Sequence, residues 1–357
     1  YLQSDSNVKK ISSYITRKVA DRLSELFAQH REEFQKKWDD LKIFIQYGII
    51  TDEKFAEKAA DFVLLKNTEG KYFTLSEYAA LVKENQTDKN GNVIYLYTND
   101  PVSQNSFVGA ARDKGYDVLV MDGQLDTHFI GWFENKNQGT RFVRVDADVV
   151  DKLIEKENNL KMALSSAQQD LLRPVFEAQL PAEDKIRYTV SFEPMAENQM
   201  PVMITQNEFM RRMKDMAAMG GSGMQFYGQL PDNFNVVING NHPLVAEILG
   251  EVEASYGDKL KTTNKKLDAA IAEQRSFEEL VKDKKAEDFS QEEKDKQQEV
   301  DKKVEDLRRQ RTERLTEIGR ENKLVKQVVD LALLSNSMLK GENLTNFIRR
   351  SVELIGK

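Results

Sequence analysis

Residues 321–357 read ENKLVKQVVDLALLSNSMLKGENLTNFIRRSVELIGK, and this stretch decides how the rest of the chain is organised. Two apolar segments, at about 322–334 and 344–355, flank a break whose serine, asparagine and glycine residues can stop and cap helices. On a helical wheel the apolar side chains of the first segment cover roughly 200°, wider than the ~100° stripe that one packing partner requires. We therefore expect two terminal helices that cover their own domain with one face and have apolar surface to spare.

The spare apolar surface predicts a homodimer. The same helix pair from a second copy would cover it and form a two-fold four-helix bundle. The alternative is that both helices simply close the core of a monomer. The residues expected at the seam between two copies are Leu324, Val328, Leu331, Leu344, Phe347, Ile348 and Ile355.

The composition excludes several classes of protein. Lysine and arginine number 52 against 59 aspartate and glutamate, and the net charge of -7 argues against a nucleic-acid-binding surface. The chain has no cysteine, which excludes disulfides and thiolate metal sites and fits a cytoplasmic protein. No apolar run approaches ~18 residues, so we expect no membrane span. The chain begins at Tyr1 without an initiator methionine or signal peptide, and we interpret it as a fragment of something longer.

The first 155 residues predict helices followed by a small α/β sheet. Apolar spacing indicates a helix at 5–29, a second that stops at Gly48, a third capped by Thr51 and a fourth capped by Ser76. Apolar runs at 93–97, 118–121 and 141–145 then alternate with helical segments, which predicts a parallel sheet layered with helices.

The carboxyl edge of such a sheet can bind a nucleotide or another small molecule. No G-x-G-x-x-G follows any of the three strands, so a phosphate-binding site at this edge is disfavoured. A small-molecule enzyme working at this edge stays as a rival interpretation. The three histidines, His30, His128 and His242, lack ligand-like spacing, and we expect no metal site.

The remaining residues, 156–357, predict an α+β domain with a charged insertion. A long helix is expected over 148–179, followed by strands at 187–192, 202–205 and 234–238 with helices between and after them. Charged side chains fill 34 of the 63 positions at 258–320, a composition that also permits disorder. Residual helical spacing and a capping box at Ser290 favour two long charged helices that form a hairpin joined near residue 289.

Methionine is concentrated in one part of the chain. Eight of the eleven methionines lie between Met195 and Met224, and a helix predicted at 208–219 carries an apolar stripe opposite a charged face. Flexible, polarisable methionine suits a surface that accepts many apolar partners, although it also fills ordinary cores. The residues of the stripe are Phe209, Met210, Met213, Met216 and Met219. The run Gly220–Gly223 that follows has neither the lysine nor the spacing of a phosphate loop and is expected to be a linker.

Several motifs together resemble those of the ninety-kilodalton heat-shock chaperones, most of all the bacterial branch of that family. They are Leu2-Gln3, Val8-Lys9-Lys10-Ile11, Tyr14-Ile15, Gly48-Ile49-Ile50-Thr51-Asp52, Lys58-Ala59-Ala60 with Phe62, Gly115-Tyr116-Asp117-Val118-Leu119 with Met121-Asp122, Asn241-His242-Pro243-Leu244-Val245, and Leu344, Phe347, Ile348 and Arg349. The resemblance covers nearly the whole chain apart from the charged stretch, where typical members of the family are much shorter. It is also loose at Thr127 and His128, which replace the acidic and aromatic residues usual in the family.

The resemblance implies a homodimeric, ATP-driven chaperone of the heat-shock response that binds partly folded proteins, its clients. It implies that residues 1–155 are the later part of the middle domain and 156–357 the dimerisation domain. The ATPase domain, with its ATP and Mg²⁺, would then lie upstream, so we expect no cofactor in this fragment and no ATP hydrolysis by it. Gln3 falls at a glutamine of the family's catalytic loop and is the one candidate catalytic residue. The helix at 208–219 matches an amphipathic element that members of the family expose toward the dimer cleft, which implies that clients bind at its stripe. A rival interpretation is a non-enzymatic dimeric scaffold that uses the charged hairpin as a docking arm.

Overall fold

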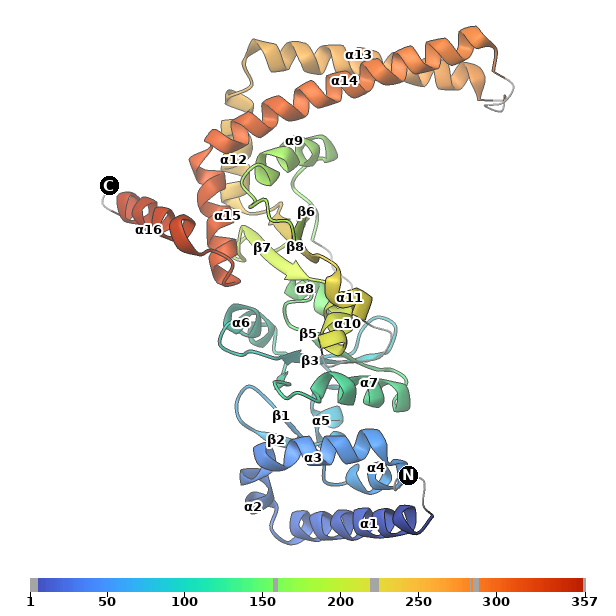
Figure 1. Cartoon of the computed structure of the whole chain (residues 1–357). Helices are drawn as coiled ribbons and strands as arrows, with labels where there is room; N and C mark the ends of the chain where they lie inside the picture. Colours follow the sequence, from blue (N-terminus) through green and yellow to red (C-terminus); the bar gives the residue numbers. More distant parts are fainter. Residues whose placement is uncertain (1–5, 157–159, 219–224, 283, 285–288, 356–357) are drawn as a thin grey trace. The chain divides into compact units, whose positions relative to one another are not determined.

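The computed structural model describes residues 6–156, 160–218, 225–282, 284 and 289–355. The chain forms two compact units (Figure 1), the first made of Tyr1–Asn159 and Thr205–Phe234 and the second of Leu160–Ile204 and Asn235–Lys357. The chain first passes from the first unit to the second between residues 159 and 160, close to the division expected near residue 155. The segment 205–234 then returns to the first unit, so a helix in this segment belongs to the unit that precedes it in the chain.

The first unit begins with a layer of helices. These are α1 (Ser6–Gln29), α2 (Arg31–Lys36), α3 (Trp38–Thr51) and α4 (Glu53–Ala59). The expected helix stop at Gly48 is wrong, because α3 runs on to Thr51. A Cβ on Gly48 would lie 2.6 Å from the Phe55 ring, so this glycine allows α3 and α4 to approach closely. The cap of α4 is Asp52 rather than Thr51, and its carboxylate accepts a hydrogen bond from the Phe55 N–H at 3.0 Å.

A short antiparallel pair, β1 (Leu64–Lys66) with β2 (Tyr72–Thr74), leads into α5 (Leu75–Val82). Thr74 caps this helix and Ser76 does not. The Thr74 hydroxyl accepts from the backbone of Glu77, and the Glu77 carboxylate accepts from the Thr74 N–H. The sequence showed the right kind of residue but placed the cap two positions too late.

The three-stranded sheet of the first unit is parallel, with the order β4-β3-β5. Its elements are β3 (Val93–Thr98), α6 (Asn105–Asp113), β4 (Val118–Val120), α7 (Asp126–Lys136) and β5 (Thr140–Arg144). The buried run of β3 suits a strand covered on both faces. Aromatic side chains dominate the core below it, where the Tyr95 ring packs edge-on against Tyr78 and Phe142. The expected mixture of helices and small sheets is confirmed.

The helix expected over 148–179 is wrong, because this stretch holds two short helices. They are α8 (Val150–Leu153) and α9 (Ser166–Glu177). Leu160, an expected member of one continuous apolar seam, is 43% exposed. A new capping box between Ser165 and Gln168 starts α9 instead.

A second sheet has the strand order β6-β8-β7. In chain order the elements of this part are β6 (Ile186–Glu193), β7 (Val202–Gln206), α10 (Glu208–Ala218), α11 (Gln225–Gln229), β8 (Asp232–Asn239) and α12 (Pro243–Ala254). The chain crosses from the second unit to the first within β7 and returns within β8.

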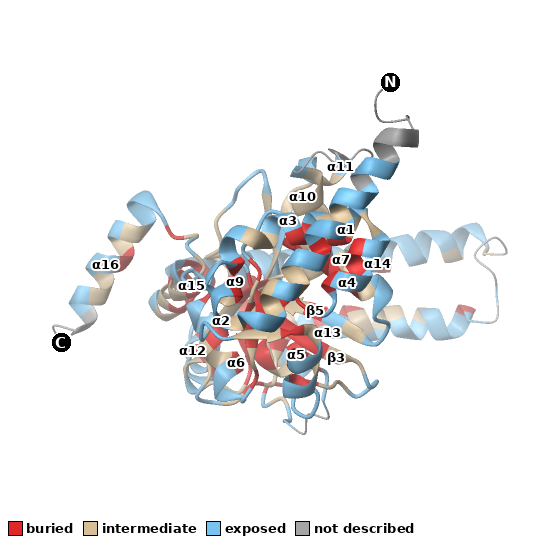
Figure 2. Cartoon of the chain, turned by 90° about the horizontal axis from the view of Figure 1, so that it is seen from below, coloured by how far each residue is buried: buried red, intermediate tan, exposed pale blue. Residues whose placement is uncertain are grey.

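The charged stretch forms a helical hairpin, α13 (Gly257–Val281) and α14 (Gln291–Glu321). A thin seam of Leu267, Ala270 and Val304 is buried between the two helices, and both remain mostly exposed along their outer parts (Figure 2). The capping box predicted at Ser290 and Glu293 is present. Lys296 and Lys303 of α14 both pair with Glu273 of α13, so ion pairs supplement the seam.

The chain ends in α15 (Lys323–Ser335) and α16 (Gly341–Ile355). Asn322 ends α14 and caps α15, with its side chain accepting from the Val325 N–H at 2.8 Å. Gly341 has φ +57 at the break before α16, a backbone conformation that glycine adopts without strain. The terminal helix pair expected from the sequence is therefore present in the second unit.

Candidate functional site

Helix α10 lies at the carboxyl edge of the parallel sheet. At the end of β3 the Tyr97 hydroxyl donates to the Glu208 carboxylate at 2.5 Å. At the end of β5 the Arg144 guanidinium donates to the Asp215 carboxylate at 2.9 Å. The carboxyl edge is where open α/β sheets usually bind ligands. In this unit a helix of the same chain occupies it.

Asp146, just after β5, is the centre of this contact and is only 6% exposed. Its carboxylate accepts from Arg211 of α10 at 2.7 Å and from the Gln104 amide at 2.6 Å. Its backbone carbonyl accepts from the Gln206 N–H at 3.0 Å, immediately before α10. The carboxylate and the backbone carbonyl of Asp146 therefore both hold the segment that carries α10.

Three arginines and four carboxylates share this contact. Besides the pairs above, Arg212 donates to Glu134 of α7 at 2.8 Å and pairs with Glu208 one turn earlier. Burial raises the pKa of the Asp146 carboxyl, and the charge of Arg211 opposes that rise. Burial likewise lowers the pKa of the Arg211 guanidinium, although arginine stays charged. The charges are thus desolvated and depend on their partners.

The charged face of α10 is the face that contacts the rest of its unit. Glu208, Arg211, Arg212 and Asp215 all lie on it, and the apolar stripe lies on the opposite side of the helix. Figure 2 shows α10 as half-buried, and none of its residues is fully buried. This arrangement inverts the usual one, in which an amphipathic helix buries its apolar face.

The predicted stripe is partly covered by α11 and partly open. Phe209 is 60% exposed, whereas Met210, Met213 and Met216 are half-buried. Helix α11 packs beside α10, where a Cβ on Gly228 would lie 3.8 Å from the Ala217 Cβ. Phe226 of α11, the helix that packs on α10, is 67% exposed and is a second exposed aromatic side chain of this helix pair. The sequence analysis missed Phe226, although an aromatic residue after a glycine-rich run was a usable signal.

Two of the three histidines lie at the starts of helices. His242 caps α12, with its Nδ1 accepting from the Leu244 N–H at 3.1 Å, and His30 precedes α2. Within the described ranges no group of three or more His, Asp or Glu side chains could hold a metal ion. No helix in the same ranges is both long and apolar enough to cross a membrane.

The terminal helices α15 and α16 are joined through a buried carboxylate. Asp330 of α15 is 0% exposed and pairs with Lys326 at 2.9 Å and with Arg350 of α16. Gln327 donates to Ser351 at 3.0 Å beside it. Because a buried carboxylate requires a partner, these contacts set the register of α16 on α15.

The residues predicted for the dimer seam fall into different environments. Val328 and Phe347 are buried within one copy, Leu331 and Leu344 are half-buried, and Ile348 is 53% exposed. Val352, one turn after Ile348, is 63% exposed and was not predicted. The outer face of α16 thus carries an uncovered apolar pair, while the buried members join α15 and α16 to their own unit.

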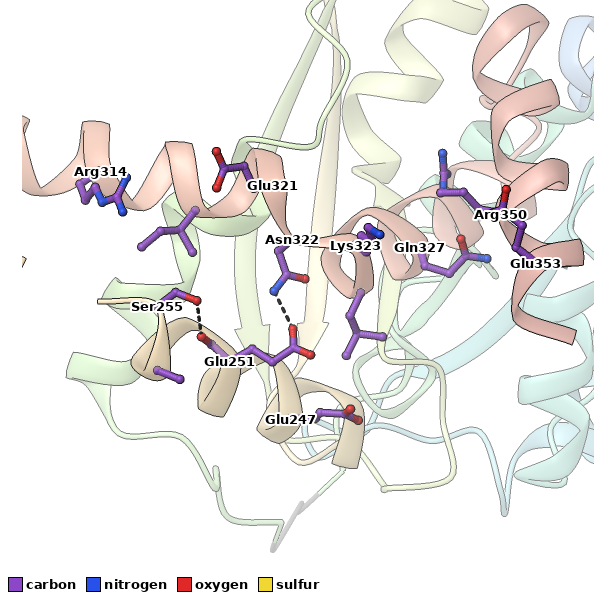
Figure 3. A pocket seen from close by; sticks show the side chains of 13 residues that line it. Glu247, Glu251, Ser255, Arg314, Glu321, Asn322, Lys323, Gln327, Arg350 and Glu353 are labelled. Carbon is purple, nitrogen blue, oxygen red and sulfur yellow. Dashed lines mark hydrogen bonds between the residues drawn. The ribbon is translucent and has the colours of Figure 1, made fainter. Parts of the chain in front are cut away.

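Leu324, also predicted for the seam, lines an open pocket of about 720 Å³ in the second unit. Figure 3 shows its walls, which come from α12, the end of α14, α15 and α16. Asn322 donates to Glu251 across it at 2.7 Å. Acidic and basic side chains alternate around this pocket, including Glu247, Arg314 and Arg350, so it has no single charge preference.

Some predicted residues lie outside the described part of the chain. Gln3, Met219 and the run Gly220–Gly223 are among them, as is the side chain of Ile355. The catalytic assignment of Gln3 therefore stays a prediction.

Comparison with known sequences decides the family. The family profile described as Hsp90 protein matches residues 1–271, well over half of the chain. The chain belongs to the Hsp90 family. The profile match ends within α13, so the whole of α14 lies beyond it.

Among curated relatives, the Chaperone protein HtpG of Bacteroides thetaiotaomicron is 47% identical over 355 residues. The match covers 99% of this chain and 52% of the relative. The Chaperone protein HtpG of Porphyromonas gingivalis is 44% identical with the same coverage. That of Bdellovibrio bacteriovorus is 25% identical over 257 residues, or 70% of this chain and 39% of the relative. This member of the Hsp90 family thus spans about half the length of the relatives it matches most fully.

Sequence reasoning did not find Tyr97, Glu134, Arg144 or Asp146, which hold α10 in this Hsp90-family chain. Arg144 and Asp146 lie two positions apart at the end of a buried strand, and this pattern could have indicated a buried charged contact. A charged pair in such a place must find partners, but the sequence does not say which.

Proposed function

We propose that this chain is the part of an ATP-driven chaperone that joins two copies and offers an apolar surface to partly folded client proteins. The observation that carries the proposal is the inverted docking of α10. Its charged face contacts Asp146, Glu134 and Arg144, and its opposite face carries the exposed Phe209 and the half-buried methionines of the stripe. The family membership and the names of the relatives support the same function.

The chemistry of this surface suits clients without a fixed sequence. We define it as Phe209, Met210, Met213 and Met216 of α10 with Phe226 of α11. Methionine side chains are flexible and polarisable, so they can adapt to different apolar partners. A contiguous exposed apolar patch is also uncommon unless it binds something. The charged contacts behind α10 hold the helix in place without using this face.

The test replaces Met213 and Met216 together by serine. Because both side chains are half-buried, we expect a loss of about 1 kcal/mol or less in unfolding free energy, below the ~2–5 kcal/mol typical of a core methionine truncation. Suppression of the aggregation of an unfolded client should fall severalfold at the same time. Met162→Ser is the matched control, because Met162 is also a half-buried methionine but belongs to the second unit and is not part of the proposed client surface. A large loss of stability would show that the stripe is part of the core. Unchanged client binding would show that the stripe is not part of the client surface.

The terminal helices are proposed as the dimer contact. Support comes from Ile348 and Val352, which leave an apolar pair uncovered on α16 of a single chain. The contact with a second copy would cover this pair, since burying apolar surface is favourable by roughly 25 cal/mol per Å². The oligomeric state of variants at these positions tests it, as set out in the Discussion.

The nucleotide cycle is proposed for the longer protein and not for this chain alone. ATP and Mg²⁺ would be held by upstream residues, with Gln3 near the transferred phosphate, in a cytoplasmic protein. No phosphate-binding G-x-G-x-x-G sequence follows a strand in this chain. The carboxyl edge of its parallel sheet is covered by α10, which weighs against the rival interpretation as a small-molecule enzyme.

The second candidate function is a scaffold with α13 and α14 as a docking arm. The observation that favours it is the exposure of this hairpin, with Leu280 81% exposed near its tip. A pull-down that depends on residues 258–320 and not on Met213 and Met216 would support the scaffold. Dependence on the two methionines would support the chaperone surface.

A further inference from the structure

Helix α10 is attached to its unit mainly through charge. The buried apolar cluster of the first unit extends from Ala20 to Phe142 and, within the described residues, contains no side chain of α10. The helix instead contributes Arg211, Arg212 and Asp215 to ion pairs with the sheet and with α7. Besides these pairs, α10 packs against α11, which belongs to the same returning segment, and against α7.

The pairs are buried enough to matter. Each pair has at least one partner that is largely covered, because the Asp146, Arg212 and Arg144 side chains are 8%, 14% and 4% exposed, whereas most ion pairs on the hairpin have both partners largely exposed. Exposed pairs contribute little to stability, but losing one partner of a buried pair leaves a desolvated charge. For α10 this cost can be avoided only if the helix leaves and water reaches the remaining charge.

We propose that three ion pairs, Arg211–Asp146, Arg212–Glu134 and Arg144–Asp215, form an ionic latch that positions the client surface. This inference rests on the proposed function for the identity of the ligand, a partly folded protein. Asp146, Glu134 and Arg144 are positioning residues, since they lie behind α10 and act through it. Closing the latch keeps the stripe of α10 facing outward on a fixed support. Opening it frees the helix and lets its apolar stripe turn inward.

The latch explains why the helix can be amphipathic and still expose its apolar side. An amphipathic helix free to rotate would bury its methionines against the nearest apolar surface, as the hydrophobic effect favours. Here the partners of the charged face lie at the sheet edge and on α7, and rotating α10 would separate the buried Asp146 from Arg211. We assign these buried ion pairs a role in fixing the orientation of α10 rather than in net stability.

The test uses the full chain and amide hydrogen exchange read by mass spectrometry over 208–218. Arg211→Met and Asp146→Asn each remove one charge, and each should speed exchange in α10 about a hundredfold, equivalent to about 2.8 kcal/mol at 1.4 kcal/mol per tenfold. The double variant removes both charges, so it should recover most of the protection, since a neutral pair leaves no stranded charge. Arg211→Lys keeps the charge and should recover part of it.

Lys214→Met is the matched control on the same helix, because Lys214 pairs with the exposed Asp232 and takes no part in the latch. It should change exchange less than about fivefold. The aromatic core of the unit lies outside the latch, so its melting temperature should stay nearly constant in all variants. Unchanged exchange in both single variants would overturn the latch, whatever the client assay shows.

Suppression of client aggregation distinguishes the latch from the client surface. The single variants should lose severalfold activity and the double variant should regain it. If exchange rises but suppression holds, while Met213→Ser with Met216→Ser weakens it, the positioning role is overturned and the client surface stands. If the methionine variant also has no effect, the proposed function fails and the positioning inference fails with it.

Discussion

Gly319 is the one glycine in the charged stretch 258–320, and we predict that alanine at this position destabilises the second unit. It lies in α14 where that helix packs on α9. A Cβ on Gly319 would be 2.4 Å from the Val175 carbonyl oxygen and 2.8 Å from the Val175 Cα. Both are backbone atoms, so neither can move aside as the end of a flexible side chain would.

The magnitude follows from two opposing effects. Alanine is favoured over glycine in a helix by about 1 kcal/mol. Overpacking costs about 1–3 kcal/mol, and a backbone clash belongs at or above the upper end. Moving α14 away would also lengthen the hydrogen bond from the Gln179 amide to the Gly319 carbonyl, now 2.6 Å, which contributes about 1 kcal/mol. We expect a net loss of about 3 kcal/mol in unfolding free energy.

Thermal unfolding followed by circular dichroism measures this loss. At about 2–4 °C per kcal/mol for a unit of this size, Gly319→Ala should lower Tm by about 6–12 °C. Gly250→Ala is the control, because Gly250 lies in α12 of the same unit with nothing within 4 Å of the added Cβ. That change should raise stability by about 0.5–1 kcal/mol. A Gly319→Ala chain as stable as the Gly250→Ala chain would refute the close packing of α14 on α9.

Two further predictions concern the dimer and the response to acid. Replacing Ile348 and Val352 by aspartate should change the unfolding free energy by under about 0.5 kcal/mol per site, as at ordinary surface positions. Light scattering should nevertheless show that the dimer has become a folded monomer. A wild-type chain that is monomeric at tens of micromolar would contradict the dimer. Hydrogen bonds from Arg31 and from the Thr74 N–H lower the pKa of Glu77 from 4.5 to about 2. Because the folded pKa is the lower one, Glu77 stabilises the first unit above pH 4.5, and this contribution is lost as the pH falls toward 2. The Glu77 side chain is 41% exposed, so solvent screening weakens its ion pair. In urea unfolding, Glu77→Gln should therefore lower the unfolding free energy by about 1 kcal/mol at pH 7 and by little at pH 2. An equal loss at both pH values would argue against this assignment.

Local patterns in the sequence predicted elements whose partners are near in the chain. The parallel sheet followed from alternating apolar runs and helices, because a β-α-β unit has essentially one way to fold. The hairpin of α13 and α14 followed from helical spacing at Leu267 and Val304 and from the capping box at Ser290. The stripe of α10 was also visible, since the separation of apolar and charged faces depends only on the spacing of Phe209, Met213 and Met216.

Local patterns misled where a residue serves a distant contact. Gly48 was taken as a helix stop, but it leaves room for the Phe55 ring while α3 continues. Leucines between 153 and 171 matched the spacing of a single helix, yet the cap at Ser165 starts a separate one and leaves Leu160 exposed. In both cases the spacing was right and the partner was not visible in the sequence.

The residue spacing of α10 predicts two faces, one apolar and one charged. A helical wheel does not say which face meets the rest of the protein. The tertiary structure decided this, because the fold brings Glu134, Arg144 and Asp146 from more than sixty residues earlier to the edge where α10 docks. Once those charges are buried they need oppositely charged partners, and that requirement places the charged face of α10 against the sheet edge and the methionines on the opposite face.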